Sequence, residues 1–261
     1  SAARAGEMSR GQKETSMKKS TASFITLLIV ACCGLPELQG EPDNKTSATG
    51  VQLMEVGEFH GEEIAAKTGE QWLGLFVSDG EAALVFTTVR VEQFHDEIVD
   101  HEPDAMTGKR VSIADPTAPL FLLRGADMLQ PGQVATAHSE AVALTKQSDI
   151  ELELAGIKYR LNVVTKDKRR DSSMFLDDAK LVFSSAGREQ TLYALGGKGL
   201  HEADVSWSLL WAGDLDGDTR LDLYVQVSGH YNSSERKLFL SSQAKKKQLV
   251  RELAAFVTTG C

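Results

Sequence analysis

Apolar and polar residues alternate along much of the chain after residue 50, with the period of two that is typical of half-buried β-strands. The clearest case is a hairpin in which 71–77 and 82–91 flank the turn Asp79-Gly80, a dipeptide favoured in tight turns. Further β-rich runs lie at 119–124, 150–154, 158–165, 179–184, 190–195 and 237–241, with Gly156 and Gly187 at turn positions. The pattern predicts a mainly β domain over 51–261, either an antiparallel β-sandwich or a curved sheet.

One segment near the C-terminus has helical spacing instead. The apolar positions that recur there are Leu249, Val250, Leu253, Phe256 and Val257. We expect a short C-terminal helix over this segment. The preceding cationic run 245–247 would oppose the dipole at the start of a helix, so a strand is the alternative.

The N-terminal region has the features of a targeting segment. Met17-Lys18-Lys19 precedes the apolar run 24–31, which is much shorter than the roughly 20 residues that span a bilayer. The order of these features predicts a secretory signal peptide over 17–31. Met17 is the preferred start and Met8 the alternative, so we expect 1–16 to be an upstream extension that is not native.

The end of the apolar run, Ile29-Val30-Ala31-Cys32, resembles the lipobox of bacterial lipoproteins. In that family a small residue precedes a cysteine that is diacylated and becomes the mature N-terminus. The resemblance implies lipidation of Cys32, with the protein in the bacterial outer membrane or periplasm. An ordinary signal peptide cut after Gly40, giving a secreted protein, is the alternative. The small and polar residues of 32–50 predict a flexible tether.

The overall charge argues against nucleic acid as a partner, because the 28 Lys and Arg and 37 Asp and Glu give a net charge of −9. The chain has three cysteines. If Cys32 is lipidated, Cys33 and Cys261 remain, and a disulfide between them is left open.

The densest group of candidate ligands lies in the segment 214–222. Asp214, Asp216, Asp218 and Asp222 occupy positions 1, 3, 5 and 9 of this segment. Two like charges about 4 Å apart repel by roughly 4 kcal/mol at an effective dielectric of about 20. A hard cation with oxygen ligands removes this repulsion, and Ca²⁺ is the usual one. The alternative is an acidic turn that is only solvated.

The residues on either side determine the kind of loop. The flanks 205–211 and 221–227 alternate with a period of two, which predicts strands that each bury one face. An EF-hand requires flanking helices, Gly at position 6 and Glu at position 12. Here these positions hold Thr219 and Val225, so the EF-hand is excluded.

The block Gly213-Asp214-Leu215-Asp216-Gly217-Asp218 followed by Leu221-Asp222-Leu223 resembles the calcium loop of FG-GAP and VCBS-type proteins. The resemblance implies that the four aspartates and the backbone carbonyl of Arg220 bind Ca²⁺. Members usually have Gly where this chain has Thr219, which predicts a strained turn or weaker binding. The chain has one such loop and no blade repeat, so the propeller of that family is not expected.

The C-terminal third also resembles secreted proteins of Gram-negative bacteria. The shared features are the block Trp211–Asp218, the step His230-Tyr231-Asn232 and the terminal Gly260-Cys261. This resemblance implies a lineage and no activity.

The segment 94–102 is rich in metal-type ligands, including His95 and His101. Their spacing of six does not match a zinc motif, so a solvated polar edge is favoured over a transition-metal site. The chain contains neither a nucleophile elbow nor a phosphate-binding loop. We therefore expect a non-enzymatic, calcium-stabilised envelope module that binds a protein or a glycan. The alternative is an extracytoplasmic hydrolase, which a deep cleft lined by convergent polar groups would favour.

Overall fold

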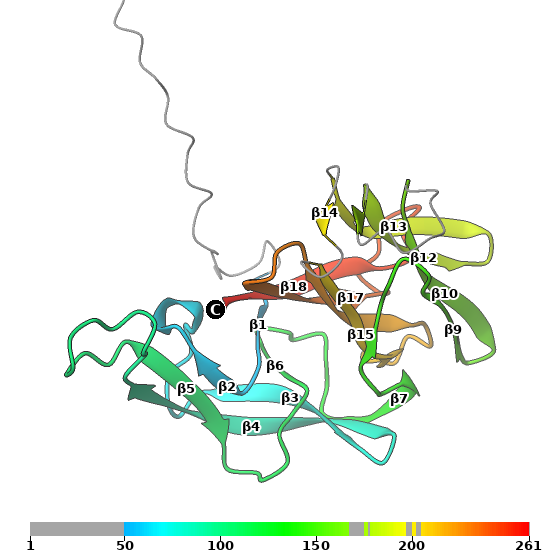
Figure 1. The fold of residues 1–261 in the computed structure, drawn as a ribbon. Helices are drawn as coiled ribbons and strands as arrows, with labels where there is room; N and C mark the ends of the chain where they lie inside the picture. Colours follow the sequence, from blue (N-terminus) through cyan, green and yellow to red (C-terminus); the bar gives the residue numbers. More distant parts are fainter. Residues whose placement is uncertain (1–49, 167–174, 177, 197–199, 202–204, 261) are drawn as a thin grey trace, which may run out of the picture. The chain divides into compact units, whose positions relative to one another are not determined.

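The computed structural model describes residues 50–166, 175–176, 178–196, 200–201 and 205–260 (Figure 1). The predicted upstream extension 1–16, the predicted signal peptide 17–31 and the predicted tether up to residue 49 lie outside the described residues, as do all three cysteines. Within the described ranges there is no helix of the length and apolarity that crossing a membrane requires.

The prediction of a mainly β domain is confirmed. The larger sheet contains twelve strands, and nine of them follow one path in the order β1, β6, β3, β4, β7, β15, β16, β17, β18. Their bounds are β1 Gln52–Met54, β6 Phe121–Arg124, β3 Gln71–Ser78, β4 Glu81–Phe94, β7 Gly132–His138, β15 Ser206–Asp214, β16 Asp222–Ser228, β17 Ser233–Leu240 and β18 Arg251–Thr259. The terminal strands β1 and β18 contact each other, so the path almost closes on itself (Figure 1).

The remaining strands extend this sheet or form smaller ones. The strands β2 (Gly57–Phe59), β5 (Gly108–Ile113) and β8 (Val142–Ala143) pair beside the main path, and a short 3₁₀ helix, η1 (Gly61–Glu63), follows β2. A second sheet has the order β13 (Arg188–Leu195), β12 (Ala179–Ser185), β10 (Ile157–Val164), β9 (Asp149–Leu154). β11 (Phe175–Leu176) pairs with β14 (Leu200–His201).

The predicted hairpin turns are present. Ser78 pairs with Glu81 across the turn between β3 and β4, where Asp79 has φ of 52° and Gly80 has φ of 83°. Two successive residues with positive φ are typical of the tight turn that matches strand twist. Gly156 and Gly187, with φ of 78° and 74°, close the hairpins β9–β10 and β12–β13 in the same way.

Two apolar clusters share the hairpin β15–β16. The first core lies within the larger sheet and includes Trp72, Phe121, Trp211, Tyr224 and Phe256. The second core joins the four-stranded sheet to the other face of the hairpin and includes Leu161, Phe183, Trp207, Leu209 and Val225. The hairpin that carries the acidic segment is therefore buried on both faces.

This double burial corrects the prediction that each flanking strand buries one face. A β-bulge interrupts β15, since Leu209 pairs with Val225 whereas Trp211 pairs with Tyr224. The extra residue, Leu210, shifts the alternation, so Trp207 packs in the second core and Trp211 in the first.

The expected short C-terminal helix is wrong, because the segment forms β18, which pairs with β17. The helical spacing has two structural causes. Leu249 and Val250 precede the strand and pack in the second core, whereas Phe256 packs in the first. A bulge also falls at Leu253, since Leu238 pairs with Ala254 and Phe239 with Glu252. A strand with a bulge, preceded by residues that pack in the other core, therefore has apolar residues at the spacing expected of a helix.

Burial of both faces of β16 can be tested at two positions that the sequence places on the same face. Tyr224 is fully buried and its ring contacts Phe121 edge-on, with centroids 4.9 Å apart. We expect Tyr224→Ala to lower the free energy of unfolding by about 3–5 kcal/mol. The half-buried Gln226 is the matched control, and Gln226→Ala should cost less than about 1 kcal/mol. Equal effects in urea unfolding would contradict the double burial.

Candidate metal centre

The acidic segment is the turn between β15 and β16, with Asp214 ending one strand and Asp222 beginning the other. A close backbone approach fixes the entrance of the turn. A Cβ on Gly213 would lie 2.3 Å from the carbonyl oxygen of Ala135 in β7 and equally close to the Trp211 ring. Only glycine fits there, so the start of the turn is held against the neighbouring strand.

The carboxylate of Asp214 organises the backbone of the turn. Its Oδ1 accepts the amides of Gly217 at 2.8 Å and Asp218 at 3.0 Å, and its Oδ2 accepts the amide of Thr219 at 2.9 Å. Each carboxylate oxygen can accept two bonds. Asp214 therefore keeps acceptor capacity for a cation while it folds the turn around itself.

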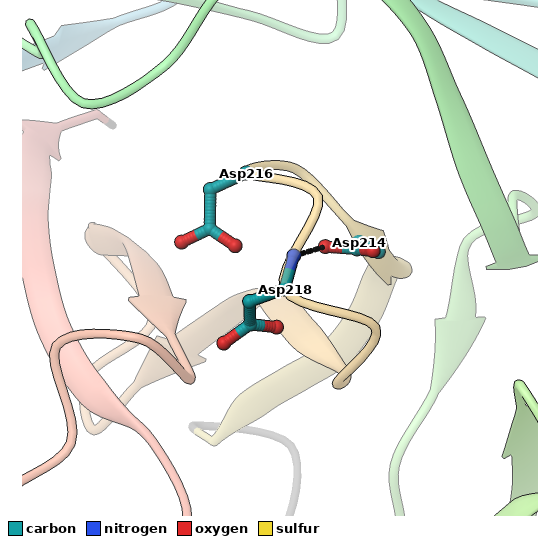
Figure 2. Close-up of side chains that lie close together, drawn as sticks. All are labelled: Asp214, Asp216 and Asp218. Carbon is teal, nitrogen blue, oxygen red and sulfur yellow. Dashed lines mark hydrogen bonds between the residues drawn. The ribbon is translucent and has the colours of Figure 1, made fainter.

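Three of the predicted ligands come together. One carboxylate oxygen from each of Asp214, Asp216 and Asp218 lies within 4.8 Å of the others, and Figure 2 shows the three side chains at the turn, with the backbone amide of Asp218 donating to Asp214. Oδ1 of Asp216 is buried and has no hydrogen-bond partner within the described residues. A buried, unpartnered carboxylate oxygen is costly in water-free surroundings, and a bound cation would satisfy it.

Neighbouring donors balance part of the charge. The guanidinium of Arg220 donates to Oδ2 of Asp218, with Nη2 at 2.6 Å. The hydroxyl of Ser241 donates to both oxygens of Asp218, at 2.9 and 2.8 Å, and the hydroxyl of Ser242 donates to Asp216. Sequence reasoning missed both serines. The two serines lie beside the turn because β16 and β17 pair in an antiparallel register that places Leu223 opposite Phe239. A prediction of that strand pairing is what would have located them.

Asp222 lies outside this group of three and has a different position. Its side chain is fully buried, and its oxygens accept the amides of Leu215 at 2.8 Å and Ser241 at 2.7 Å. Burial raises the pKa of the Asp222 carboxyl well above its ordinary value, and the charge of Asp216 adds to the increase. Binding of a metal by Asp222 and by the carbonyl of Arg220 stays a prediction.

The electrostatics of the turn favour a positive ligand. Burial raises the pKa of the Asp216 carboxyl, and the negative charges of Asp218 and Asp214 raise it further, against the opposing hydrogen bond from Ser242. A carboxyl whose pKa is raised by folding destabilises the protein once the pH exceeds its ordinary value of 3.8. A divalent cation would reverse this effect by stabilising the ionised form.

The donor set fits a hard cation. It consists of carboxylate oxygens in an irregular turn, without sulfur or nitrogen, which suits ions that prefer oxygen ligands. These residues could hold such an ion and so tie the ends of β15 and β16 together. The contact from Tyr159, whose hydroxyl accepts the amide of Leu221 at 3.3 Å, links the turn to the four-stranded sheet.

The second group of candidate ligands forms a hydrogen-bonded loop. Asp100 accepts the hydroxyl of Thr107 at 2.6 Å and the backbone amide of Asp96 at 2.8 Å. These bonds hold the pKa of the Asp100 carboxyl at about 2. His101 is exposed, whereas His95 bonds to the carbonyl of Ala105. The two histidines therefore have different surroundings, and within the described residues they belong to no group of converging metal ligands.

No protein-family model, curated protein or solved structure matches the chain. The resemblances to FG-GAP calcium loops and to lipoprotein lipoboxes accordingly stay predictions.

The turn contains one conformational strain that the sequence anticipated. Thr219 has φ of 64°, in the left-handed region that β-branched residues rarely adopt and that costs them about 1–2 kcal/mol. We expect Thr219→Gly to raise the free energy of unfolding by about 1 kcal/mol. The matched control is Gly217→Ala, because Gly217 has φ of 77° and should lose a similar amount. Chemical denaturation measures both changes, and a loss of stability in Thr219→Gly would contradict the strain.

Proposed function

We propose that this protein is a calcium-stabilised β module of the bacterial cell envelope that binds a protein or glycan partner. The observation that carries the metal part of the proposal is the close approach of one carboxylate oxygen from each of Asp214, Asp216 and Asp218, together with the buried Oδ1 of Asp216, which has no hydrogen-bond partner among the described residues. The envelope part rests on the lipobox-like sequence that ends at Cys32. The net charge of −9 supports a partner other than nucleic acid, because binding to phosphates requires a basic surface.

Calcium is favoured among divalent cations by the chemistry and irregularity of the ligands. Ca²⁺ takes six to eight oxygen ligands in flexible geometry, whereas Mg²⁺ demands a near-ideal octahedron. The hydrogen bonds from three amides to Asp214 fix one ligand, while Arg220 and Ser241 donate to both oxygens of Asp218. Carboxylates that already accept several hydrogen bonds suit a large cation with flexible coordination better than a small cation that requires an octahedron.

A hydrolase is the second candidate function, and one cavity favours it. This cavity of about 530 Å³ is lined by His60, His95 and Asp96, among others. His60 Nδ1 lies 2.5 Å from Asp96 Oδ2, the arrangement that orients a general base. His60 is hydrogen-bonded to the carboxylate of Asp96 and His95 to the carbonyl of Ala105, so neither bond joins an imidazole to a hydroxyl or thiol that it could activate. The geometry therefore supports a binding module better than a hydrolase.

A larger cavity, of about 780 Å³, lies against the four-stranded sheet. Acidic and basic side chains alternate across its strands, since Lys158 pairs in register with Glu153 and Arg160 with Glu151. Opposite charges on neighbouring strands stabilise each other. This surface has the balanced polarity of a solvated sheet rather than the convergent groups of an active site.

Calcium should stabilise the domain, because it binds the folded turn and not the unfolded chain. At 100 times its dissociation constant it adds about 2.7 kcal/mol, equivalent to about 5–10 °C in Tm for a domain of this size. Differential scanning fluorimetry in calcium, magnesium and chelator measures the shift. The same Tm in calcium and chelator would overturn the metal proposal.

Two substitutions sharpen this test. Asp216→Ala should abolish the shift. Asp216→Asn should also abolish it, and in chelator it should melt above the wild type, because it removes a charge that burial disfavours. Asp127→Ala, at an exposed aspartate remote in sequence from the turn, is the control and should keep the full calcium response. A calcium response retained by both Asp216 variants would contradict the assignment of this residue.

Lipidation at Cys32 predicts partition into membranes. Expressed with its full N-terminus in a Gram-negative host, the wild type should sediment with the membrane fraction and Cys32→Ser should move to the soluble fraction. Cys33→Ser is the matched control and should stay with the membrane, because the resemblance assigns the lipid to the neighbouring residue alone. Equal partition of Cys32→Ser and wild type would defeat the anchor proposal.

A further inference from the structure

The loop that joins β4 to β5, residues 95–107, carries a group of exposed apolar side chains (Figure 1). Ile98, Val99 and Met106 are 52%, 49% and 57% exposed, and we call them the apolar loop residues. Among the described residues nine large apolar side chains are exposed, and three of them lie in this stretch of nine residues. Single apolar residues scattered over a surface are ordinary, whereas a cluster of them marks a site of interaction with another molecule.

Two buried carboxylates hold this loop in one conformation. Oδ1 of Asp96 accepts the amide of Ile98 at 3.1 Å, and its Oδ2 lies 2.5 Å from Nδ1 of His60. The carboxylate of Asp100 accepts the amide of Asp96 at 2.8 Å. It also accepts the amide of Thr107 at 2.9 Å and the hydroxyl of the same residue at 2.6 Å. The loop is therefore ordered before a partner arrives, which lowers the entropic cost of binding.

Hydrogen bonds also bring the two arms of the loop side by side. Nδ1 of His95 donates to the carbonyl oxygen of Ala105 at 2.9 Å, because a carbonyl can only accept. Thr107 is bonded to Asp100, as described above. Met106 lies between these two contacts in sequence, so it belongs to the arm that runs beside the other apolar loop residues.

Apart from two histidines, the titratable side chains of this loop are all acidic. The chain has no Lys or Arg between Arg90 and Lys109. Glu97, Glu102 and Asp104 are exposed, and within the described residues their carboxylates form no ion pair. Exposed carboxylates beside apolar side chains are complementary to a partner that carries both apolar and positively charged groups.

A cavity of about 530 Å³ adjoins the loop and has the same mixed character. Phe59 and Ile98 contribute apolar surface to its wall, and Glu97 contributes a carboxylate. The other carboxylates of the wall, those of Glu58 and Asp96, are already engaged by a guanidinium and an imidazole of the protein. A Lys or Arg side chain matches this wall, because its alkyl stem packs on apolar surface while its charged end reaches a carboxylate.

We propose that the loop 95–107 and the adjoining cavity form the docking surface for a protein partner, which binds through a basic and apolar segment. A Lys or Arg side chain of the partner enters the cavity beside Glu97, and its apolar side chains cover the apolar loop residues. This inference rests on the proposed binding function, and it adds the surface and the chemistry of the partner.

The acidic residues of the loop argue against two other occupants. A bilayer that contains anionic lipids attracts basic segments and repels acidic ones. A second copy of this chain would place two identical acidic loops against each other, and like charges at an interface oppose association. A basic protein segment is the occupant that satisfies both the apolar and the acidic part of the surface.

Binding of two synthetic peptides to the full chain tests the proposal. The probe is a fluorescent peptide of alternating lysine and leucine residues, and the control is a peptide of alternating glutamate and leucine residues. Fluorescence anisotropy should show binding of the lysine peptide and none of the glutamate peptide. The affinity for the lysine peptide should fall as salt is added, because salt screens exposed charges.

Variants locate the binding surface. The double variant Ile98→Ser, Met106→Ser should weaken binding of the lysine peptide at least about tenfold. Val85→Ser is the matched control, since Val85 is an apolar residue of β4 that is 46% exposed, and it should bind as the wild type does. All three side chains are exposed, so these variants should fold.

A second pair of variants tests the charges. Glu97→Gln, Glu102→Gln should weaken binding and reduce its dependence on salt, because two of the screened charges are gone. Glu151→Gln, Glu153→Gln removes two exposed carboxylates of β9 and should change neither the affinity nor the salt dependence. The two double variants have the same net charge, so a difference between them reports position.

Three results would overturn the proposal. One is the absence of lysine-peptide binding at low salt, and another is binding of unchanged affinity in the loop variants. The third is sedimentation of the Cys32→Ser protein with vesicles of phosphatidylcholine or phosphatidylglycerol that is lost in the Ile98→Ser, Met106→Ser variant, because the loop would then bind lipid. The calcium response of the Asp216 variants and the partition of the Cys32 variants test the proposed function independently of the loop.

Discussion

The ionised carboxylates of the β15–β16 turn repel one another, and the contacts around this turn are arranged to offset that repulsion. The hairpin is packed between two cores, so the turn at its end is drawn into partly buried surroundings. Asp222, at the start of β16, is fully buried, and burial raises its pKa. The chain compensates with backbone amides, two serine hydroxyls and one guanidinium. Oδ1 of Asp216 remains without a partner among the described residues, and this is the reason for proposing that a cation completes the turn.

The same turn connects the two parts of the packing. The carboxylate of Asp222 accepts hydrogen bonds from two backbone amides, that of Leu215 within the turn and that of Ser241 just after β17. Tyr159 reaches the turn from the four-stranded sheet. A cation bound by Asp214, Asp216 and Asp218 would therefore stabilise more than a surface loop. It would hold together strands from both sheets, and this role is structural rather than catalytic.

The sequence predicted the strand content and the three hairpin turns well, because alternation and glycine placement are local signals. It failed where local pattern and tertiary position diverge. The bulge at Leu210 turns Trp211 away from the face of Trp207, and the bulge at Leu253 gives β18 the spacing of a helix. Bulges change the period without a distinctive residue type, so alternation alone cannot reveal them. The aspartates of the turn were found because they lie within nine residues of one another in sequence, whereas Ser241, Ser242 and the hydrogen bond of His60 with Asp96 depend on contacts between distant segments.

Amide hydrogen exchange would show whether calcium holds the acidic turn in its folded conformation. The amides of Gly217, Asp218 and Thr219 all donate to the Asp214 carboxylate, so their protection reports how firmly the turn is held. We expect calcium to slow exchange at these three amides and at Leu215 and Ser241, relative to chelator, and to leave the amides of the β9–β10 hairpin turn unchanged. Exchange in the acidic turn that is equally fast with and without calcium would contradict it.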